Sequence, residues 1–320
     1  MGSTASRNRW FPMRGRAKVR KRFVARCEIS VISPSAGSGL RLFLREIRIE
    51  HSLFALPFAY VGAVLGARGL PSWWALLWIT LAVMGARTAA MAANRYFDRE
   101  IDARNPRTAR RALATGALSP AVMLWAIAFG LILLLISAWM LNPLCVKLLP
   151  IAAIGVLVYP LCKRFTWLVH FVLGAVDGLA PLGAYIGVTG TVSASALLLF
   201  VAVTVWVAGF DIAYALMDLP TDREQRINSV PVRFGESAGR WLPIALHAVM
   251  AALLALAGLL GGAGWLYYAG VVAAIALTVY ENRLYGRSEN VFVLNERIFT
   301  GNMAFSVVFL AATLGGYLIH

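Results

Sequence analysis

The chain has 320 residues, of which 60% are hydrophobic and 14% are charged. A soluble domain of this size cannot bury so much apolar surface, so the composition favours a membrane protein and excludes an ordinary soluble enzyme. The net charge is +15 at pH 7. Positively charged loops on one side of a membrane and contact with anionic lipid account for this charge, so it gives no reason to infer nucleic-acid binding.

The predicted elements begin with a basic segment that contains Gly, Ser and Pro. We expect residues 1–41 to form a disordered cytoplasmic tail ahead of a transmembrane domain at residues 42–320. A spanning helix needs about 20 predominantly apolar residues. Runs of nearly this length or longer occur at about 53–70, 73–93, 121–141, 145–161, 167–189, 195–217, 241–260, 264–282 and 299–319. The sequence therefore predicts an all-α, multi-pass membrane protein of about nine transmembrane helices.

The distribution of Lys and Arg predicts the orientation of these helices. Basic residues concentrate before the first span and in the loops that follow the even-numbered spans, whereas the opposite loops carry only Arg68 and Lys147. The positive-inside rule places the N-terminus and the basic loops in the cytoplasm. We expect a bacterial inner membrane, with the mitochondrial inner membrane as the alternative.

Two acidic clusters interrupt the apolar chain, one after the second predicted span and one after the sixth. Asp98 and Asp102 lie four residues apart, as do Asp218 and Asp222. Each pair therefore shares one helix face and can hold a divalent cation. Carboxylates are unfavourable beside the negative end of a helix dipole, which favours bound cations there. The alternative is a solvated acidic cap balanced by nearby arginines, which explains one cluster more readily than two.

The two clusters are related by position in the chain. An offset of 120 residues separates Asp98 from Asp218, and the same offset separates Asp102 from Asp222. This spacing suggests two four-helix halves and a ninth helix. Asn94 lies one turn before Asp98, where its amide oxygen can join a metal shell. We expect Mg²⁺ ligands at Asn94 and at the four aspartates.

Mg²⁺ ions held in this way can bind a diphosphate, whose departure as a leaving group can generate an allylic cation. With the diphosphate bound the site stays negatively charged, so basic side chains should complete it. The candidates on the same side of the membrane are Arg95, Arg99, Arg111, Lys163, Arg164 and Arg223. Tyr214 shares a helix face with Asp218 and can hydrogen-bond the diphosphate or present its ring to an allylic cation. The alternative for Tyr214 is an interfacial tyrosine of the kind found in membrane proteins generally.

These motifs resemble those of the UbiA superfamily of intramembrane prenyltransferases. The pattern Asn94-x-x-x-Asp98-x-x-x-Asp102, followed by Asp211-x-x-Tyr214-x-x-x-Asp218-x-x-x-Asp222, carries the resemblance. Within the superfamily the chain is similar to the 4-hydroxybenzoate polyprenyltransferase branch and to relatives in futalosine-type menaquinone synthesis. The segments that add to this similarity are 50–57, 85–91, 159–166 and 233–235.

The resemblance implies helices around a central cavity, Mg²⁺ at the aspartates, a polyprenyl diphosphate donor and a small aromatic acceptor. Asp98, Asp102, Asp218 and Asp222 would be the catalytic residues. Arg95, Arg111, Lys163, Arg164 and Tyr214 would contact the diphosphate. The chain departs from the family pattern at two positions. Ala112 replaces the proline of the family's Arg-Pro-Leu, and Asn228 replaces a lysine that commonly precedes the serine at Ser229.

Two charged residues fall inside predicted spans. A charge within the membrane needs a partner. Arg87 is two turns deeper than Asn94, and the resemblance assigns it to the carboxylate of the acceptor; the alternative is an ion pair with a protein acid. Asp177 can pair with Arg87, accept a proton from the acceptor hydroxyl, or lie there without a role. We place Arg87, Asp177 and Tyr159 at the aromatic-substrate site. We expect the isolated His51, His170 and His247 to be structural.

The sequence therefore predicts the transfer of a polyprenyl group to a ring carbon of a small aromatic carboxylate. The first choice of acceptor is 4-hydroxybenzoate, in ubiquinone-type quinone biosynthesis, and the alternative is a dihydroxynaphthoate of menaquinone biosynthesis. An ion-coupled secondary transporter is the alternative of another class. Clustering of the acids at one membrane face argues against a transporter, which usually holds them near the midplane.

Overall fold

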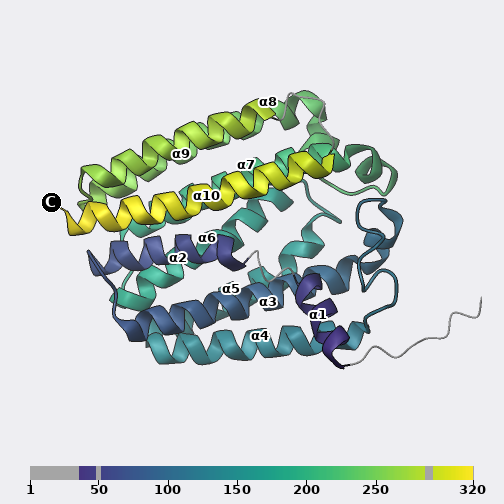
Figure 1. Cartoon of the computed structure of the whole chain (residues 1–320), viewed down its shortest axis with the longest axis horizontal. Helices are drawn as coiled ribbons and strands as arrows, with labels where there is room; N and C mark the ends of the chain where they lie inside the picture. The colour runs from purple at the N-terminus through teal and green to yellow at the C-terminus, as the bar shows by residue number, and fades with distance from the viewer. Residues whose placement is uncertain (1–35, 48–51, 285–290, 320) are drawn as a thin grey trace, which may run out of the picture. The chain divides into compact units, whose positions relative to one another are not determined.

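The computed structural model describes residues 36–47, 52–284 and 291–319 (Figure 1). All regular secondary structure in this part of the chain is helical. The helices are α1 (Ala36–Glu46), α2 (Ser52–Ala67), α3 (Trp73–Arg104), α4 (Pro120–Leu141), α5 (Pro143–Cys162), α6 (Val169–Thr189), α7 (Ala194–Glu224), α8 (Val230–Gly261), α9 (Trp265–Leu284) and α10 (Val291–Leu318). His51 lies outside the described residues, as do residues 1–35 of the predicted tail.

Each of the nine predicted spans coincides with one of the helices α2–α10. By length and composition, seven helices of the described residues can cross a membrane: α3 to α8 and the Arg297–Leu318 part of α10. The apolar part of α2 is shorter, at Ala55–Ala67. Large apolar side chains, such as Trp125 and Trp139, are exposed on the outside of the helices. Lipid tolerates such a surface, whereas water does not.

Two helices, α3 and α7, continue well beyond the C-terminal ends of their predicted spans, whereas α8 and α10 begin well before theirs. The apolar runs end near residues 93 and 217, but α3 continues to Arg104 and α7 continues to Glu224. The motif aspartates therefore lie on the last turns of regular helices, as their four-residue spacing predicts. The two helices also begin alike, since the Ser72 hydroxyl accepts a hydrogen bond from Ala75 N and the Ser193 hydroxyl accepts one from Ala196 N. These parallels support the interpretation of two related halves.

Close helix packing depends on small residues at a few positions. A Cβ atom on Gly130 of α4 would lie 2.5 Å from the carbonyl oxygen of Gly85 in α3. A Cβ atom on Gly62 of α2 would meet the carbonyl oxygen of Pro181 in α6. Only glycine allows backbones to approach this closely, which is how helices associate in lipid.

The largest apolar core of the described residues joins α2, α7, α8, α9 and α10. The ring of Phe58 in α2 lies 4.8 Å from that of Trp206 in α7 and 5.5 Å from that of Phe305 in α10, measured between centroids. Phe309 and Tyr267 extend the cluster to α9. This packing fixes α7, and hence the second acidic cluster, against the rest of the domain.

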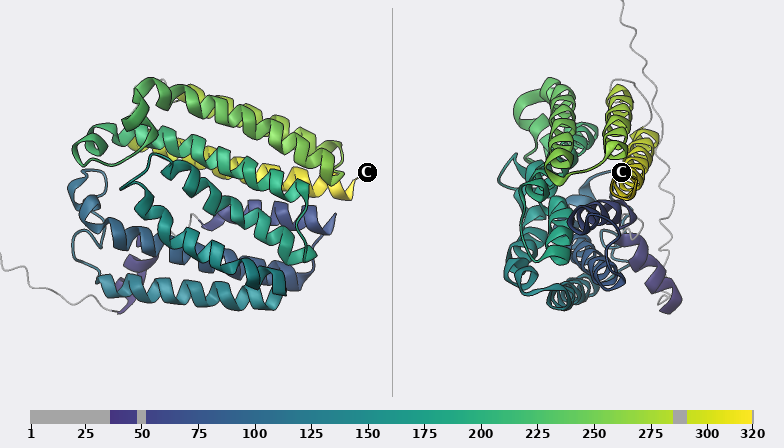
Figure 2. Two further views of the ribbon diagram at one scale, coloured as in Figure 1. Left: turned by 180° about the vertical axis from the view of Figure 1, so that it is seen from behind. Right: turned by 90° about the vertical axis from the view of Figure 1, so that its left-hand side faces the viewer.

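The loops that follow α3, α5 and α7 gather at one end of the helices, on the right in Figure 1 and on the left in the first view of Figure 2. At the same end, α8 is kinked at Gly235, whose φ of 89° favours glycine. Helix α1 also lies there. It begins at Ala36, inside the segment predicted as a tail. Apolar and basic residues alternate along its second half, so Leu42 and Phe43 can pack against a cluster that includes Leu113 and Leu118.

Candidate active site

The first acidic cluster is held by basic side chains from two different loops. Lys163 Nζ, after α5, lies 2.5 Å from Asp98 Oδ2, and Arg111 Nη1, after α3, lies 2.6 Å from Asp102 Oδ2. Both aspartates are buried, with 2% and 7% of their surface exposed. Lys163 and Arg111, both predicted to bind diphosphate, are thus placed directly at the predicted metal ligands.

The second cluster is held by a residue that the sequence did not single out. Arg107, in the loop after α3, donates from Nε to Asp218 Oδ1 at 2.9 Å and from Nη2 to Asp218 Oδ2 at 2.6 Å. Burial lowers the pKa of the Arg107 guanidinium, but the interactions with Asp218, Asp102 and Asp222 together outweigh burial, and the pKa lies above its ordinary value. Arg107 therefore remains charged and connects the loop of the first half to the acid of the second.

Two carboxylate positions in the clusters are left without a partner. Asp222 is 9% exposed, and its carboxylate makes no hydrogen bond or ion pair with any described residue. Oδ1 of Asp98 is likewise buried with no hydrogen-bond partner among the described side chains and backbone. Carboxylate oxygens are the ligands that Mg²⁺ prefers. These unsatisfied oxygens fit a hard divalent cation.

The same part of the structure contains no ready-made metal site. Among the described residues, no three His, Cys, Asp or Glu side chains form a group that could hold a metal ion. Lys163, Arg111 and Arg107 contact carboxylate oxygens of Asp98, Asp102 and Asp218. A cation that binds here has to compete with these pairs.

Asn94 lies beside Asp98, as predicted, but its amide is already engaged. Asn94 Nδ2 donates to Asp98 Oδ2 at 3.1 Å, and Asn94 Oδ1 accepts from Arg95 Nη1 at 3.0 Å. Arg95 was predicted to bind diphosphate. It is instead 4% exposed and donates from Nε to the backbone carbonyl of Glu46 at 3.1 Å. Arg95 is adjacent to Asn94, and the two side chains point about 100° apart on α3, so the Arg95 guanidinium reaches the end of α1 as well as the Asn94 amide.

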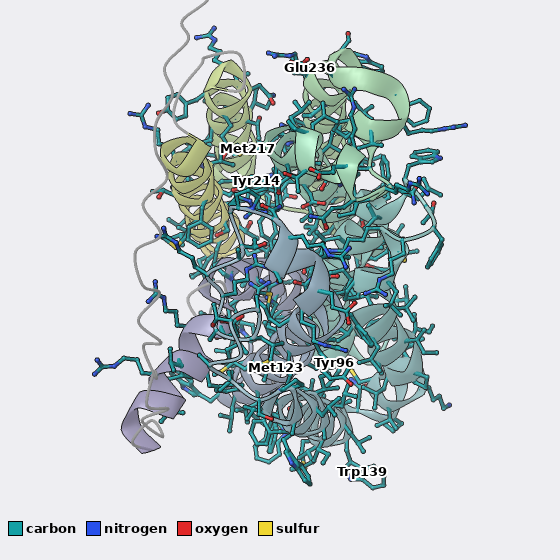
Figure 3. All side chains as sticks on the ribbon, turned by 90° about the vertical axis from the view of Figure 1, so that its right-hand side faces the viewer. Tyr96, Met123, Trp139, Tyr214, Met217 and Glu236 are labelled. Carbon is teal, nitrogen blue, oxygen red and sulfur yellow. The ribbon has the colours of Figure 1, made fainter. Side chains whose placement is uncertain are left out.

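The two remaining predicted diphosphate ligands are Arg164 and Tyr214. Arg164 Nη2 donates to the carbonyl oxygen of Phe97 at 2.5 Å, so the guanidinium covers the last turns of α3 close to Asp98. Tyr214 lies on the side of α7 that faces α10, with Met217 beside it (Figure 3). Its ring packs edge-on against Phe210 at 5.9 Å and contacts Ile298.

Asp211, at the start of the second motif, is tied to two other helices through His170. His170 Nδ1 lies 2.7 Å from Asp211 Oδ2, and His170 Nε2 accepts a hydrogen bond from Val230 N at 3.2 Å. Because Nε2 accepts, the imidazole carries its proton on Nδ1 and donates to Asp211. This arrangement agrees with the structural role expected for His170, which joins α6, α7 and the start of α8.

The departure at Asn228 has a local explanation. Asn228 N donates to the carbonyl oxygen of Lys163 at 2.7 Å, and its side-chain Nδ2 donates to the same oxygen at 3.3 Å. Asn228 therefore supplies no charge but fixes the loop that carries Lys163 to Asp98.

An apolar cavity of about 170 Å³ lies among α2, α3, α4, α5 and α6. Its only charged lining residues, within the described chain, are Arg87 and Asp177, and Arg87 Nη1 lies 3.2 Å from Asp177 Oδ1. The predicted pairing of these two residues is confirmed. Arg87 Nε is buried without a hydrogen-bond partner in the described structure. Tyr159 does not line the cavity; its hydroxyl donates to the carbonyl oxygen of Ala90 at 3.4 Å.

The model of the UbiA prenyltransferase family matches residues 55–293. The chain belongs to this family. The UbiA family match, together with the long apolar helices, makes the chain an integral membrane protein. The resemblance drawn from the two acidic motifs is thereby confirmed, as is the all-α UbiA-like fold.

Named relatives and solved structures of the UbiA family support the same conclusion. The chain is 36% identical to the 4-hydroxybenzoate octaprenyltransferase of Alkalilimnicola ehrlichii, over 80% of this chain and 88% of that protein. It is 37% identical to the enzyme of that name from Citrobacter koseri, over 68% and 74%. The apo structure of a UbiA homolog from Aeropyrum pernix K1 matches with a TM-score of 0.74 and 32% identity, over 83% of this chain and 97% of that one. A UbiA homolog from Archaeoglobus fulgidus, bound to GPP and Mg²⁺, has the same fold, with a TM-score of 0.69 and 21% identity, over 87% and 100%.

Sequence reasoning missed Arg107 and Glu46. Arg107 is one of several arginines in a basic loop, and no pattern distinguishes it from the others. Glu46 carries a weak signal, since it is one of three acids, with Glu28 and Glu50, in the first 50 residues, which are otherwise rich in Lys and Arg.

Proposed function

We propose that this protein transfers a polyprenyl group from a polyprenyl diphosphate to a ring carbon of 4-hydroxybenzoate, with Mg²⁺ as cofactor. One observation carries the proposal: the acidic ends of α3 and α7 interlock with Lys163, Arg111 and Arg107 at the end of the helices where three loops meet. The names of the relatives, which are 4-hydroxybenzoate octaprenyltransferases, supply the acceptor and the class of donor.

In this proposal Asp98, Asp102, Asp218 and Asp222 hold Mg²⁺, and Asn94 orients Asp98. The UbiA homolog bound to GPP and Mg²⁺ supports this choice of cofactor. Bound Mg²⁺ would neutralise the diphosphate and improve it as a leaving group.

The basic residues of the site act on the other oxygens of the diphosphate. Lys163, Arg111 and Arg107 already lie within hydrogen-bond distance of the motif aspartates. With Mg²⁺ held by the carboxylates, these side chains would donate to the diphosphate and stabilise the charge that grows on its oxygen as the C–O bond breaks. Arg164 is close enough to Asp98 to contribute charge. Tyr214 and Arg95 do not share this position, and the proposal gives them no diphosphate contact.

The acceptor binds at the cavity in this account. Its apolar wall suits an aromatic ring, and the Arg87 guanidinium, oriented by Asp177, suits the acceptor carboxylate. The low-polarity surroundings exclude water from an allylic cation, which would otherwise be hydrolysed. Tyr159 supports α3 from outside the cavity and is not assigned to the acceptor.

The proposed location is a bacterial inner membrane, with the N-terminus and the active-site end in the cytoplasm. The basic loops after α3, α5 and α7 support this orientation, because they all lie at the end that carries the aspartates. The diphosphate group of the donor is charged and hydrophilic, so an active site that opens to the cytoplasm suits it.

An acceptor panel tests the proposed function. Purified protein in detergent is incubated with a labelled long-chain prenyl diphosphate, Mg²⁺, and either 4-hydroxybenzoate, a dihydroxynaphthoate or phenol. We expect a prenylated product with 4-hydroxybenzoate, its loss on chelation of Mg²⁺, and little product with phenol, which lacks the carboxylate. Preference for the dihydroxynaphthoate would move the protein to menaquinone-type chemistry. No consumption of diphosphate with any acceptor would remove the enzyme function and leave the transporter alternative.

A further inference from the structure

Glu46 is a buried acid at the end of α1, outside both acidic motifs. It is 6% exposed, and its Oε2 accepts a hydrogen bond from the backbone N–H of Ala112 at 2.9 Å. Its Oε1 lies 3.7 Å from Arg95 Nε, and its backbone carbonyl accepts a hydrogen bond from the same nitrogen. A carboxylate that is buried needs such partners, because an unpaired buried charge is strongly unfavourable. Glu46 therefore joins α1, α3 and the loop after α3 at one point.

Both partners of Glu46 lead directly to the first acidic cluster. On one side, Arg95 donates to Asn94, and Asn94 donates to Asp98. On the other side, Ala112 follows Arg111, which binds Asp102 at 2.6 Å. The Glu46 carboxylate thus contacts Arg95 on one side and the Ala112 N–H on the other. The contacts that continue from Arg95 end on Asp98, and those that continue from Ala112 end on Asp102.

The hydrogen bond from Ala112 depends on the residue type at that position. A proline there would have no backbone N–H and could not donate to Glu46. Alanine leaves this loop more conformational freedom in the unfolded chain than proline would, and the bond to Glu46 restricts the loop in the folded protein. The apolar contacts of Leu42 and Phe43 with the cluster around Leu113 and Leu118 hold α1 in the position that this bond requires.

We propose that Glu46 is a positioning residue for the Mg²⁺–diphosphate site: it fixes Arg111 through the loop and Asp98 through Arg95 and Asn94. This proposal rests on the proposed function. It assigns α1, which precedes all the spanning helices, a part in arranging the first half of the site. Glu46 itself does not touch the substrate in this account.

The test compares Glu46→Ala, which removes both interactions, with Glu46→Gln, which keeps an acceptor for Ala112 N but removes the charge beside Arg95. Glu236→Ala is the matched control, because Glu236 is exposed and, among the described residues, its one ion pair is with Arg240 on its own helix. Three readouts are measured on each detergent-purified variant. They are Mg²⁺ binding by calorimetry with a non-hydrolysable prenyl thiodiphosphate, amide hydrogen exchange in the segment 105–118, and the KM for the aromatic acceptor.

We expect Glu46→Ala to weaken Mg²⁺ binding by about 10-fold or more, as for partners that orient metal ligands. Exchange in 105–118 should rise in the same variant, and the KM for the aromatic acceptor should stay unchanged. Glu46→Gln should retain most of the exchange protection and lose part of the Mg²⁺ affinity. Adding Ala112→Pro to Glu46→Ala should recover affinity, since proline restricts the loop without the bond.

Wild-type Mg²⁺ affinity in Glu46→Ala, or a loss matched by Glu236→Ala, would overturn the proposal. So would unchanged exchange in 105–118. If Glu46→Ala fails to fold, Glu46→Gln decides, and unaltered Mg²⁺ binding in that variant counts against the proposal. Failure of the proposed function can be distinguished from failure of this proposal, because the wild-type protein would then neither bind Mg²⁺ with the thiodiphosphate nor consume a prenyl diphosphate.

Discussion

Arg107 binds both carboxylate oxygens of Asp218, with Nε 2.9 Å from Oδ1 and Nη2 2.6 Å from Oδ2. The two residues are 111 positions apart and belong to different halves of the chain. A bidentate contact of this kind fixes the orientation of the Arg107 side chain relative to Asp218 as well as their distance, since the guanidinium is planar and rigid. The loop after α3 therefore carries one arginine for its own cluster and one for the other cluster.

Arg107→Ala should lower kcat/KM for the prenyl diphosphate by about 10- to 100-fold, because a charge-assisted hydrogen bond contributes about 1.5–3 kcal/mol. Arg107→Lys should recover only part of the loss, since lysine keeps the charge but cannot bind both oxygens. Steady-state kinetics at varied diphosphate concentration measure the effect. Arg110→Ala, in the same basic loop, is the control. An equal loss in both variants would show that only net charge matters.

Arg87→Gln should raise the KM for 4-hydroxybenzoate by about 10-fold or more while leaving the KM for the diphosphate unchanged, because it removes the proposed partner of the acceptor carboxylate. Phenol, which has no carboxylate, should react equally poorly with the variant and with the wild type. Acceptor kinetics with both compounds measure this. A change confined to the diphosphate KM would place Arg87 at the donor instead.

Asp177→Asn should destabilise the protein by about 3 kcal/mol, the typical cost of leaving one member of a buried ion pair uncompensated. Thermal unfolding in detergent measures the change. Asp177→Asn combined with Arg87→Gln should be more stable than Asp177→Asn alone, because the unpaired charge is gone. Unchanged folding and activity in Asp177→Asn would remove Asp177 from both the fold and the mechanism.

Gly130→Ala should destabilise the contact between α3 and α4 by about 1–3 kcal/mol, because overpacking forces backbones apart. The added Cβ would lie 2.5 Å from the carbonyl oxygen of Gly85. Gly183→Ala is the matched control, since a Cβ on Gly183 of α6 has no atom within 4 Å. Thermal unfolding of the two variants under one detergent condition gives the comparison. Similar unfolding temperatures would contradict the close approach of these helices.

The spanning helices could be predicted from the sequence because lipid requires a long apolar run with its backbone satisfied internally. The pair Arg87–Asp177 could be predicted for a related reason, since a charge within the membrane needs a partner and few candidates exist. The ends of α3 and α7 were harder to place. Their final turns are polar, so hydropathy stops at residue 93 or 217 although the helices continue.

The partners of the aspartates could be predicted only in part. Lys163 and Arg111 contact the motif aspartates, as the motifs predicted. Arg95, predicted to bind diphosphate, donates to Glu46 instead, whereas Arg107, for which no role was predicted, binds Asp218. All four are basic residues on one side of the membrane, and the positive-inside rule gives each the same weight. The direction of a side chain on the last turns of α3, and the path of the loop after it, decide which of them reaches an aspartate.

In the proposed function, the acidic ends of α3 and α7 form one Mg²⁺–diphosphate site from two halves of the chain. The most direct test of this shared site is Mg²⁺-dependent formation of prenylated 4-hydroxybenzoate by the wild type, Asp98→Asn and Asp218→Asn, at equal amounts of folded protein. We expect each substitution alone to reduce the rate by at least about 100-fold, because removing one member of a catalytic unit costs nearly as much as removing several. Near wild-type product formation by either variant would contradict a single site built from both helices.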